Sequence, residues 1–323
     1  MASATPPGDQ LAPPTPAVLE QARRVVGAAL RPTPLLAADA LGAGTAIKLE
    51  AAQPTGSFKV RGALTALSAL PREREVVTVS TGNHAMATAW AAQRVGRRAR
   101  IVVPATIAPP KLAGLRRFDS VVELVDGTYD DAEAHALAQV ARGAARWLSP
   151  YNDPLVIAGQ ATLGAELEQL EGPLTVVVQV GGGGLLAGVA LWARERRDVR
   201  VVGVESDVSR AVSAALAAGA VVPVEVGETL ADGMAGNIEA GSITVEAIAD
   251  RVDAMTTVDD DEIATAMRWL AAAHGIVAEG AGAVGVAALL AGRVAVEGRA
   301  VAIVTGRNVA LPLLARVLAG GGA

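Results

Sequence analysis

The chain has 323 residues, of which 51% are hydrophobic and 19% are charged, a composition typical of a globular protein with a large core. A net charge of −5 and an aromatic content of 2% argue against a nucleic-acid partner, and no uncharged apolar run is long enough to span a membrane. Because cysteine is absent, disulfides, thiolate metal ligands and a cysteine nucleophile are excluded.

Residues 1–16, MASATPPGDQLAPPTP, lack the basic and apolar regions of a secretory signal. Their content of proline, alanine and threonine predicts a disordered arm. We therefore expect a soluble, cytoplasmic protein whose folded part begins near residue 17.

Beyond the arm, short β-branched runs alternate with longer alanine-rich stretches, and this alternation predicts parallel sheets with helices on both faces. The predicted strands are Val76–Val79, Arg100–Val103, Val121–Val125, Thr175–Val180, Val201–Val204 and Ala300–Val304. The predicted helices include Ala85–Val95, Leu185–Arg196, Asp259–Ala273 and Gly282–Ala291. Several strands are apolar throughout, as expected where both faces of a sheet are covered.

Prolines at 104, 109 and 110 interrupt the middle of one α/β block, and SPYNDP at 149–154 reads as a connector. We therefore expect a small domain over residues 75–150, inserted into a large domain made of residues 17–74 and 151–323. Each domain would contain an open, twisted parallel sheet.

The stretch QPTGSFKVRG at 53–62 contains one of only three lysines among 28 basic residues. Arginine stays charged, whereas lysine can lose its proton when desolvated and can form a Schiff base. Lys59 follows a turn with a capping serine, Ser57, and begins a predicted helix whose positive end favours the neutral amine. Lys48 and Lys111 are expected to be ordinary solvated surface lysines.

The stretch Ser80-Thr81-Gly82-Asn83-His84 lies between a predicted strand and a predicted helix. Capping needs only one such polar residue. Three of them around a glycine suit a carboxylate or phosphate bound at a helix N-terminus. His84 taken alone is more typical of a structural residue than of a catalyst.

Four glycines, Gly181, Gly182, Gly183 and Gly184, follow a predicted strand and begin a predicted helix, an arrangement that suits an anion or phosphate nest. The apolar flanks VVVQV and LLAGVALW disfavour a flexible linker. The stretch fits a dinucleotide-binding fingerprint less well, because Leu186 stands at the position of its third glycine. Glu205 could still be the acid that binds the ribose, so a dinucleotide site stays open as an alternative.

The last predicted strand ends in Thr305-Gly306-Arg307-Asn308, and ligands bind at the carboxyl ends of strands in open α/β sheets. Taken alone this stretch is more typical of a simple turn. A neutral lysine, a phosphate nest and a carboxylate-binding turn together describe a pyridoxal phosphate site for an amino acid.

These motifs resemble the fold-type II pyridoxal phosphate enzymes, and among them the serine/threonine dehydratase (ammonia-lyase) and serine racemase group. PTGSFKVRGA resembles the group's cofactor-lysine motif, STGNHA its asparagine loop and GGGGLLAG its tetraglycine phosphate loop. AEGAGAVGVAAL at 278–289 resembles an E-P-x-G-A segment, with Gly280 in place of proline. The resemblance implies the fold of the tryptophan synthase β subunit.

The resemblance also implies roles for individual residues. Lys59 would hold the cofactor as a Schiff base and remove the Cα proton of the substrate. The other cofactor-binding residues would be Phe58, Asn83, Gly181, Gly182, Gly183, Gly184, Leu185 and Thr305, and the substrate-binding residues would be Ser80, Thr81, Gly82, His84 and Arg307. Arg307 stands where a small glycine is usual. We expect it either to favour a polar or acidic substrate or, equally well, to be a surface arginine paired with a nearby acid.

Two further departures from the group bear on activity. Racemases of the group use a serine as acid/base immediately before the loop glycine, where this chain has Thr81. Many members bind a divalent cation through two acids, but Ser209, Arg210 and Ala211 occupy the region of the second acid after Glu205. We therefore expect no metal site.

The predicted function is pyridoxal phosphate-dependent β-elimination of a β-hydroxy amino acid, such as L-threonine or L-serine, to a 2-oxo acid and ammonia. The alternatives are a dehydratase for a larger or acidic hydroxy amino acid, a racemase of the same fold and, remotely, a non-catalytic anion- or nucleotide-binding protein. The expected partners are an amino-acid substrate and a second copy of the chain in a homodimer, with neither nucleic acid nor membrane.

Overall fold

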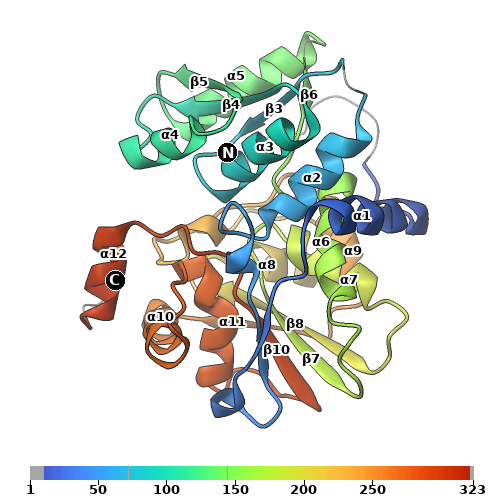
Figure 1. Ribbon diagram of the computed structural model, residues 1–323, viewed down its shortest axis with the longest axis vertical. Coiled ribbons are helices and arrows are strands. Elements are labelled where there is room, and N and C mark those ends of the chain that lie inside the picture. Colours follow the sequence, from blue (N-terminus) through green and yellow to red (C-terminus); the bar gives the residue numbers. More distant parts are fainter. Residues whose placement is uncertain (1–10, 72, 144, 321–323) are drawn as a thin grey trace.

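The computed structural model describes residues 11–71, 73–143 and 145–320, and the chain in these ranges is built on two sheets (Figure 1). The larger sheet has the strand order β1-β2-β10-β7-β8-β9, and the smaller has the order β5-β4-β3-β6. Neighbouring strands are parallel except for β1 and β2, which pair antiparallel. The predicted α/β class with two predominantly parallel sheets is confirmed.

Strand β7 lies in the interior of the larger sheet and is buried along its whole length. Val177 belongs to the apolar core beneath α10 and α11, whereas Val176 and Val178 belong to the core beneath α6 and α7. Because successive side chains point to opposite faces of a strand, one apolar run serves two cores. The strands of this sheet are β1 (Leu35–Ala37), β2 (Ala46–Lys48), β7 (Leu174–Gln179), β8 (Val199–Ser206), β9 (Ala254–Val258) and β10 (Arg299–Ile303).

The smaller sheet repeats this design with fewer strands. Helix α5 covers one face around Val77 and Val102, and helices α3 and α4 cover the other face around Ile101 and Val103. Its strands are β3 (Val76–Val79), β4 (Ala99–Pro104), β5 (Val121–Val125) and β6 (Arg146–Trp147). Two of them, β3 and β5, begin and end at the predicted residues.

The helices begin and end at local signals. Thr128 and Asp131 form a capping box at the start of α5, Asp259 and Glu262 do the same for α10, and Asp153 caps α6. The helices are α1 (Pro16–Ala29), α2 (Lys59–Ala69), α3 (Asn83–Val95), α4 (Pro109–Leu115), α5 (Tyr129–Ala141), α6 (Pro154–Ala165), α7 (Gly184–Trp192), α8 (Ala211–Ala218), α9 (Ile243–Ala249), α10 (Asp260–His274), α11 (Gly280–Leu290) and α12 (Leu311–Leu318), with short 3₁₀ turns at η1 (Asp39–Leu41), η2 (Glu50–Ala52) and η3 (Asp232–Met234).

The predicted arm falls mostly on residues 1–10, which lie outside the described residues; helix α1 begins at Pro16, inside the range given to the arm. None of the helices in the described ranges combines the length and apolar character needed to cross a membrane.

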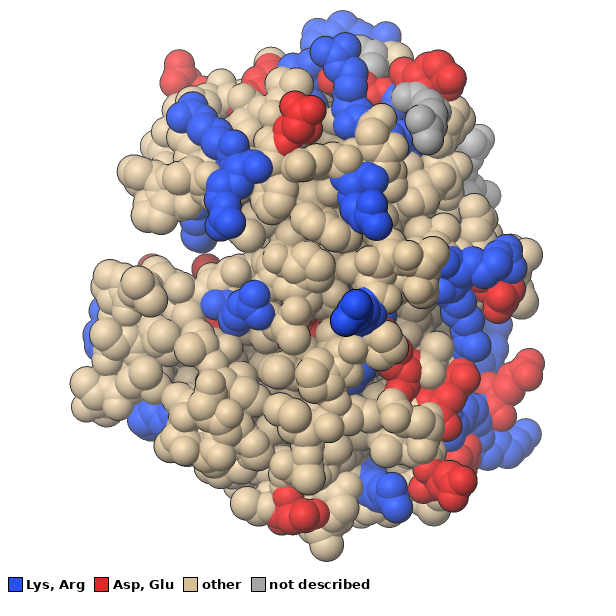
Figure 2. All heavy atoms as spheres, viewed as in Figure 1, with Lys and Arg blue, Asp and Glu red and all other residues tan. Residues whose placement is uncertain are grey.

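The two sheets lie one above the other in Figure 1, with α2 and α6 among the helices between them. Figure 2 shows that the surface is indented at the left edge of this view, between the part that carries the smaller sheet and the part that carries the larger one. The smaller sheet is built from residues 76–147, so its strands follow one another along the chain, whereas the larger sheet takes strands from both flanks.

Candidate active site

Two segments about 250 residues apart pair at the carboxyl end of β10 and place Lys59 there. Ser57 and Gly306 form an antiparallel bridge. The Phe58 amide donates to the Thr305 carbonyl oxygen at 3.0 Å, and the Arg307 amide donates to the Gly56 carbonyl oxygen at 3.0 Å. The lysine motif and the final predicted motif thus form one site.

Lys59 is the first residue of α2 and is partly buried. Its Nζ donates to the Pro150 carbonyl oxygen at 2.9 Å and lies 5.2 Å from the centre of the Phe58 ring. Burial lowers the pKa of Lys59 to about 8, although the negative charge of Glu279 opposes this effect. The direction is the predicted one, but the main cause is loss of water rather than the helix end.

Ser57 does not cap helix α2, so that prediction was wrong. The N-cap position is Phe58, and no side chain caps the helix there. The buried hydroxyls of Ser57 and Thr55 have no hydrogen-bond partner within the described residues. Polar atoms buried without partners are uncommon, and two of them beside Lys59 suit a site built for a polar ligand.

The stretch from Ser80 to His84 connects β3 to α3, as predicted. The N-cap position of α3 is Gly82, which has no side chain to cap the helix, and its amide donates to Ser80 Oγ at 3.2 Å. Plain capping therefore does not explain the polar side chains of Ser80 and Thr81. Both residues are partly exposed at the N-terminus of the helix, where an anionic group is stabilised.

His84 is buried, and its Nε2 donates to the Leu148 carbonyl oxygen at 3.3 Å. Burial, reinforced by the positive charge of Lys59, lowers the pKa of His84 to about 3. The imidazole is therefore neutral at physiological pH. Its Nδ1 has no hydrogen-bond partner in the described part of the chain.

The four glycines form the connection between β7 and α7, and three of them, Gly181, Gly182 and Gly184, have no room for a side chain. A Cβ on Gly182 would lie 2.3 Å from the Tyr151 ring, and one on Gly184 would lie 2.9 Å from Tyr151 Cα. Gly183 has φ +85° and is the N-cap residue of α7, with no side-chain cap. This close packing argues against a flexible linker, and the free amides at the helix N-terminus fit a phosphate group.

Thr305 and Arg307 follow β10 but differ in burial. Thr305 is buried, and its Oγ1 accepts a hydrogen bond from Gln179 Nε2 at 2.8 Å. Arg307 is exposed, and its Nη1 donates to the carbonyl oxygen of Ala51 in η2. The arginine thus extends across the start of the lysine segment.

Glu279 is a residue of the site that was not singled out from the sequence. Its Oε1 accepts from Asn83 Nδ2 at 2.6 Å, and its Oε2 accepts from the Asn308 amide at 3.0 Å. Burial raises the pKa of Glu279 to about 7. Two signals were available: Glu279 is the acid of the segment AEGAGAVGVAAL, and it is the sole charged residue between positions 275 and 292.

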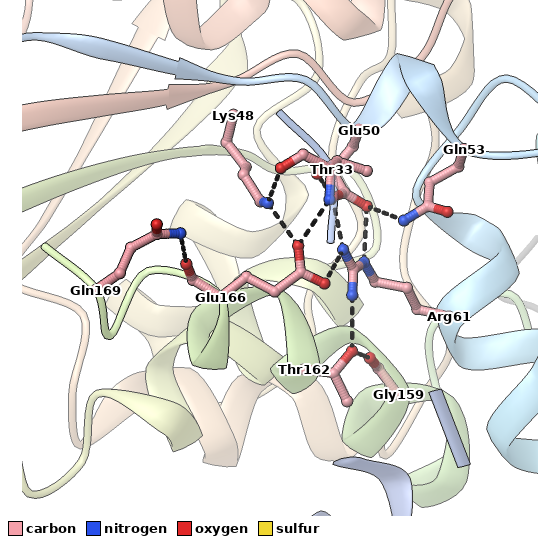
Figure 3. A network of polar contacts seen from close by, with 9 residues as sticks. All are labelled: Thr33, Lys48, Glu50, Gln53, Arg61, Gly159, Thr162, Glu166 and Gln169. Atoms are coloured by element: carbon pink, nitrogen blue, oxygen red, sulfur yellow. Dashed lines mark hydrogen bonds and ion pairs between the residues drawn. The ribbon is translucent and has the colours of Figure 1, made fainter. Parts of the chain in front are cut away.

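Lys48 is not a solvated surface lysine, contrary to the prediction. Its side chain is completely buried, and its Nζ contacts Glu166 Oε2 at 2.5 Å and the Thr33 carbonyl oxygen at 2.7 Å (Figure 3). Because a charged group is rarely buried without a partner, the acid explains its position. Lys111 is exposed, as predicted.

Arg61, two residues after Lys59, joins the same buried network. Its guanidinium contacts Glu50 at 2.7 and 2.8 Å and Glu166 at 2.7 Å, as Figure 3 shows. Helix α6 approaches so closely that a Cβ on Gly159 would lie 2.5 Å from the Arg61 carbonyl oxygen. These contacts fix the first turn of α2, which carries Lys59.

Glu205, the acid considered as a cation ligand, accepts hydrogen bonds from the chain itself. The Glu205 carboxylate accepts from the Val212 amide at 2.9 Å, the Ser213 amide at 3.1 Å and the Ser213 hydroxyl. Its oxygens thus bind the first turn of α8. Within the described ranges no cluster of three or more histidines and acids is arranged to hold a metal ion.

Comparisons with known proteins agree with this geometry. A family model described as pyridoxal-phosphate dependent enzyme matches residues 26–306. The chain is 41% identical over 278 residues to L-threonine ammonia-lyase of Thermotoga maritima, covering 84% of this chain and 69% of the relative. Among solved structures, serine racemase from maize has a TM-score of 0.87 at 28% identity, covering 96% and 98% of the two chains. The processed form of threonine deaminase isoform 2 from Solanum lycopersicum has a TM-score of 0.85 at 30% identity, covering 99% and 93%.

Proposed function

Because the chain belongs to the pyridoxal-phosphate-dependent enzyme family, we propose that it is an ammonia-lyase acting on a β-hydroxy amino acid such as L-threonine or L-serine. Loss of the β-hydroxyl as water, followed by hydrolysis, would give a 2-oxo acid and ammonia. The observation that carries the proposal is Lys59, an amine with lowered pKa at the carboxyl end of β10. Its Nζ donates to Pro150, next to the Tyr151 that packs on the glycine loop, and its charge acts on His84 in the first turn of α3.

The cofactor, when bound, supplies the electron sink that stabilises negative charge at the substrate Cα. Lys59 Nζ would bind its aldehyde and, after release by the substrate amine, take up the Cα proton. A pKa of about 8 suits this role, since the amine is partly neutral near physiological pH and still basic enough to accept a proton.

The remaining residues would bind and orient. The amides of Gly181–Leu185 would hold the phosphate, and the N-terminus of α3 with Ser80, Thr81 and Gly82 would hold the substrate carboxylate. Thr305 Oγ1 accepts from Gln179 and donates to the Ala281 carbonyl oxygen at 3.5 Å, a long contact that the hydroxyl could exchange for the ring nitrogen. A neutral hydroxyl there would leave the ring nitrogen unprotonated.

The test is product analysis with purified protein and added pyridoxal phosphate. L-Threonine and L-serine should each yield equal amounts of a 2-oxo acid and ammonia, and the remaining substrate should keep its L configuration. Appearance of the D enantiomer without ammonia would instead support the racemase alternative, which Thr81 disfavours.

An acidic hydroxy amino acid is the second candidate substrate, because the exposed guanidinium of Arg307 can bind a second carboxylate. We expect Arg307→Gly to lower kcat/KM for hydroxyaspartate about 10- to 150-fold, the range of one charge-assisted hydrogen bond, with little change for threonine and serine. Equal changes on all three substrates would show that Arg307 does not select the substrate.

That the enzyme is a cytoplasmic homodimer stays a prediction. Light scattering measures the mass of the assembly and tests the homodimer.

A further inference from the structure

The side-chain amide of Asn83 is held from two directions. Its Nδ2 donates to Glu279 Oε1 at 2.6 Å, and its Oδ1 accepts from Asn308 Nδ2 at 2.6 Å. Asn308 is itself fixed, since its Nδ2 also donates to the Thr55 carbonyl oxygen at 2.8 Å and its amide donates to Glu279 Oε2 at 3.0 Å. Glu279, Asn83 and Asn308 therefore form a closed ring of hydrogen bonds.

Glu279 is rigidly placed within this ring. It is the N-cap residue of α11, and its amide donates to the Gly306 carbonyl oxygen at 3.1 Å. A Cβ on Gly306 would lie 2.0 Å from Glu279 Oε1, so the carboxylate occupies the space that the missing side chain leaves. The turn after β10 and the start of α11 thus set the position of the carboxylate together.

The ring leaves Asn83 with one unused donor. A side-chain amide nitrogen carries two hydrogens, and the described residues provide Asn83 Nδ2 with the single acceptor Glu279 Oε1. If the amide turned over, its oxygen would face the carboxylate and both contacts of the ring would be lost. The carboxylate therefore determines which atom of Asn83 faces the site.

We propose that Glu279 is a positioning residue, which orients Asn83 so that its second N–H points to an oxygen of the bound cofactor. This inference rests on the proposed function, in which Asn83 binds the cofactor. It assigns a role to an acid that acts through another side chain rather than on the substrate.

The test compares Glu279→Gln with a matched control. Glutamine has the shape of glutamate but carries a donor group, so it cannot accept from Asn83 and from the Asn308 amide at the same time. Glu205→Gln is the control, because Glu205 is also buried and accepts two backbone amides but contacts α8 rather than the site. Melting curves and circular dichroism establish that both variants are folded.

In Glu279→Gln we expect the visible band of bound pyridoxal phosphate to persist, with a shifted absorbance maximum and a dissociation constant raised at least 10-fold. The value of kcat should fall while KM for threonine changes little. Glu205→Gln should match the wild type in all of these. The variant Asn83→Ala should reproduce the effects. Above about pH 9, where the Lys59 amine is mostly neutral with or without the charge of Glu279, the double variant Asn83→Ala/Glu279→Gln should be no worse than Asn83→Ala alone.

A wild-type band and dissociation constant in Glu279→Gln would overturn the inference, as would additive effects in the double variant. If Glu279→Gln is poorly folded, Asn308→Ala replaces it in the experiment, because it removes the hydrogen bond to Asn83 Oδ1. A wild-type protein that forms no band at all is a different result, since it contradicts the proposed function itself.

Discussion

At the scale of single residues, the partly buried Lys59 and the buried Glu279, two side chains of opposite charge, set the chemistry of the site. Loss of water lowers the pKa of Lys59 to about 8 and raises that of Glu279 to about 7. In water the same groups would titrate about six units apart. Both are thus brought close to physiological pH, where a small change in their surroundings alters which of them holds a proton.

The first prediction concerns the rate at which cofactor-free protein captures pyridoxal phosphate. Only the neutral amine attacks the aldehyde, so the rate should rise with pH and level off above about 8, rather than near the value of an ordinary lysine. Because the charge of Glu279 raises the pKa of Lys59, Glu279→Gln should move the midpoint to lower pH. Stopped-flow absorbance measures this rate, and a midpoint near pH 10 would contradict the lowered pKa.

At the scale of secondary structure, helix α2 is held by contacts of two of its residues. In its first turn, Lys59 donates to the Pro150 carbonyl oxygen. Arg61 contacts Glu50 and Glu166, as Figure 3 shows. The buried network of Figure 3 contains two acids, Glu50 and Glu166, and two basic side chains, Lys48 and Arg61, so its net charge is close to zero. Removal of one of these side chains leaves a buried charge without its partner, so substitutions in this network should destabilise the protein.

We expect Arg61→Met to lower the free energy of unfolding by about 3–5 kcal/mol, because Glu50 and Glu166 lose their shared guanidinium. The matched control is Arg23→Met, which removes an ion pair with Glu168 whose side chains are 44% and 46% exposed. An exposed pair of this kind contributes less than about 1 kcal/mol. Urea unfolding monitored by circular dichroism measures both, and equal effects would show that the buried network is unimportant.

The connection between β8 and α8 is the second element that bears on function. Glu205 binds the first turn of α8, and Ser209–Ala211 supply no second acid. We therefore expect EDTA to leave the melting temperature and the activity unchanged. Loss of either on chelation, with recovery after addition of magnesium or calcium, would show that a cation binds here.

At the scale of the whole molecule, the apolar β-branched strands and the contiguous motifs could be predicted from the sequence, because their signals are local. Strands β1, β2 and β6 have two or three residues, too few to show a period. Helix α6 was missed because it is apolar nearly all round, and its capping residue Asp153 was interpreted as part of a connector.

Contacts between distant segments could not be predicted. The acid that explains the burial of Lys48 is 118 residues away, and the acid that holds Asn83 is 196 residues away. The fold brings these partners together, and neither the hydrophobic periodicity nor a motif of one sequence predicts which distant residues will form a pair. For the same reason the segment that contains Glu279 could be noted as a motif, but the contact of this acid with Asn83 could not be predicted.

The central claim is that Lys59, and no other lysine, binds pyridoxal phosphate and enables turnover. The most direct measurement is the visible absorbance and threonine turnover of Lys59→Ala, Lys59→Arg and Lys111→Ala, each purified with added cofactor. We predict that both Lys59 variants lose the band and the activity, since a guanidinium cannot replace the amine, and that Lys111→Ala, altered at an exposed position, keeps both. Retention of the band and of turnover in Lys59→Arg would contradict this account.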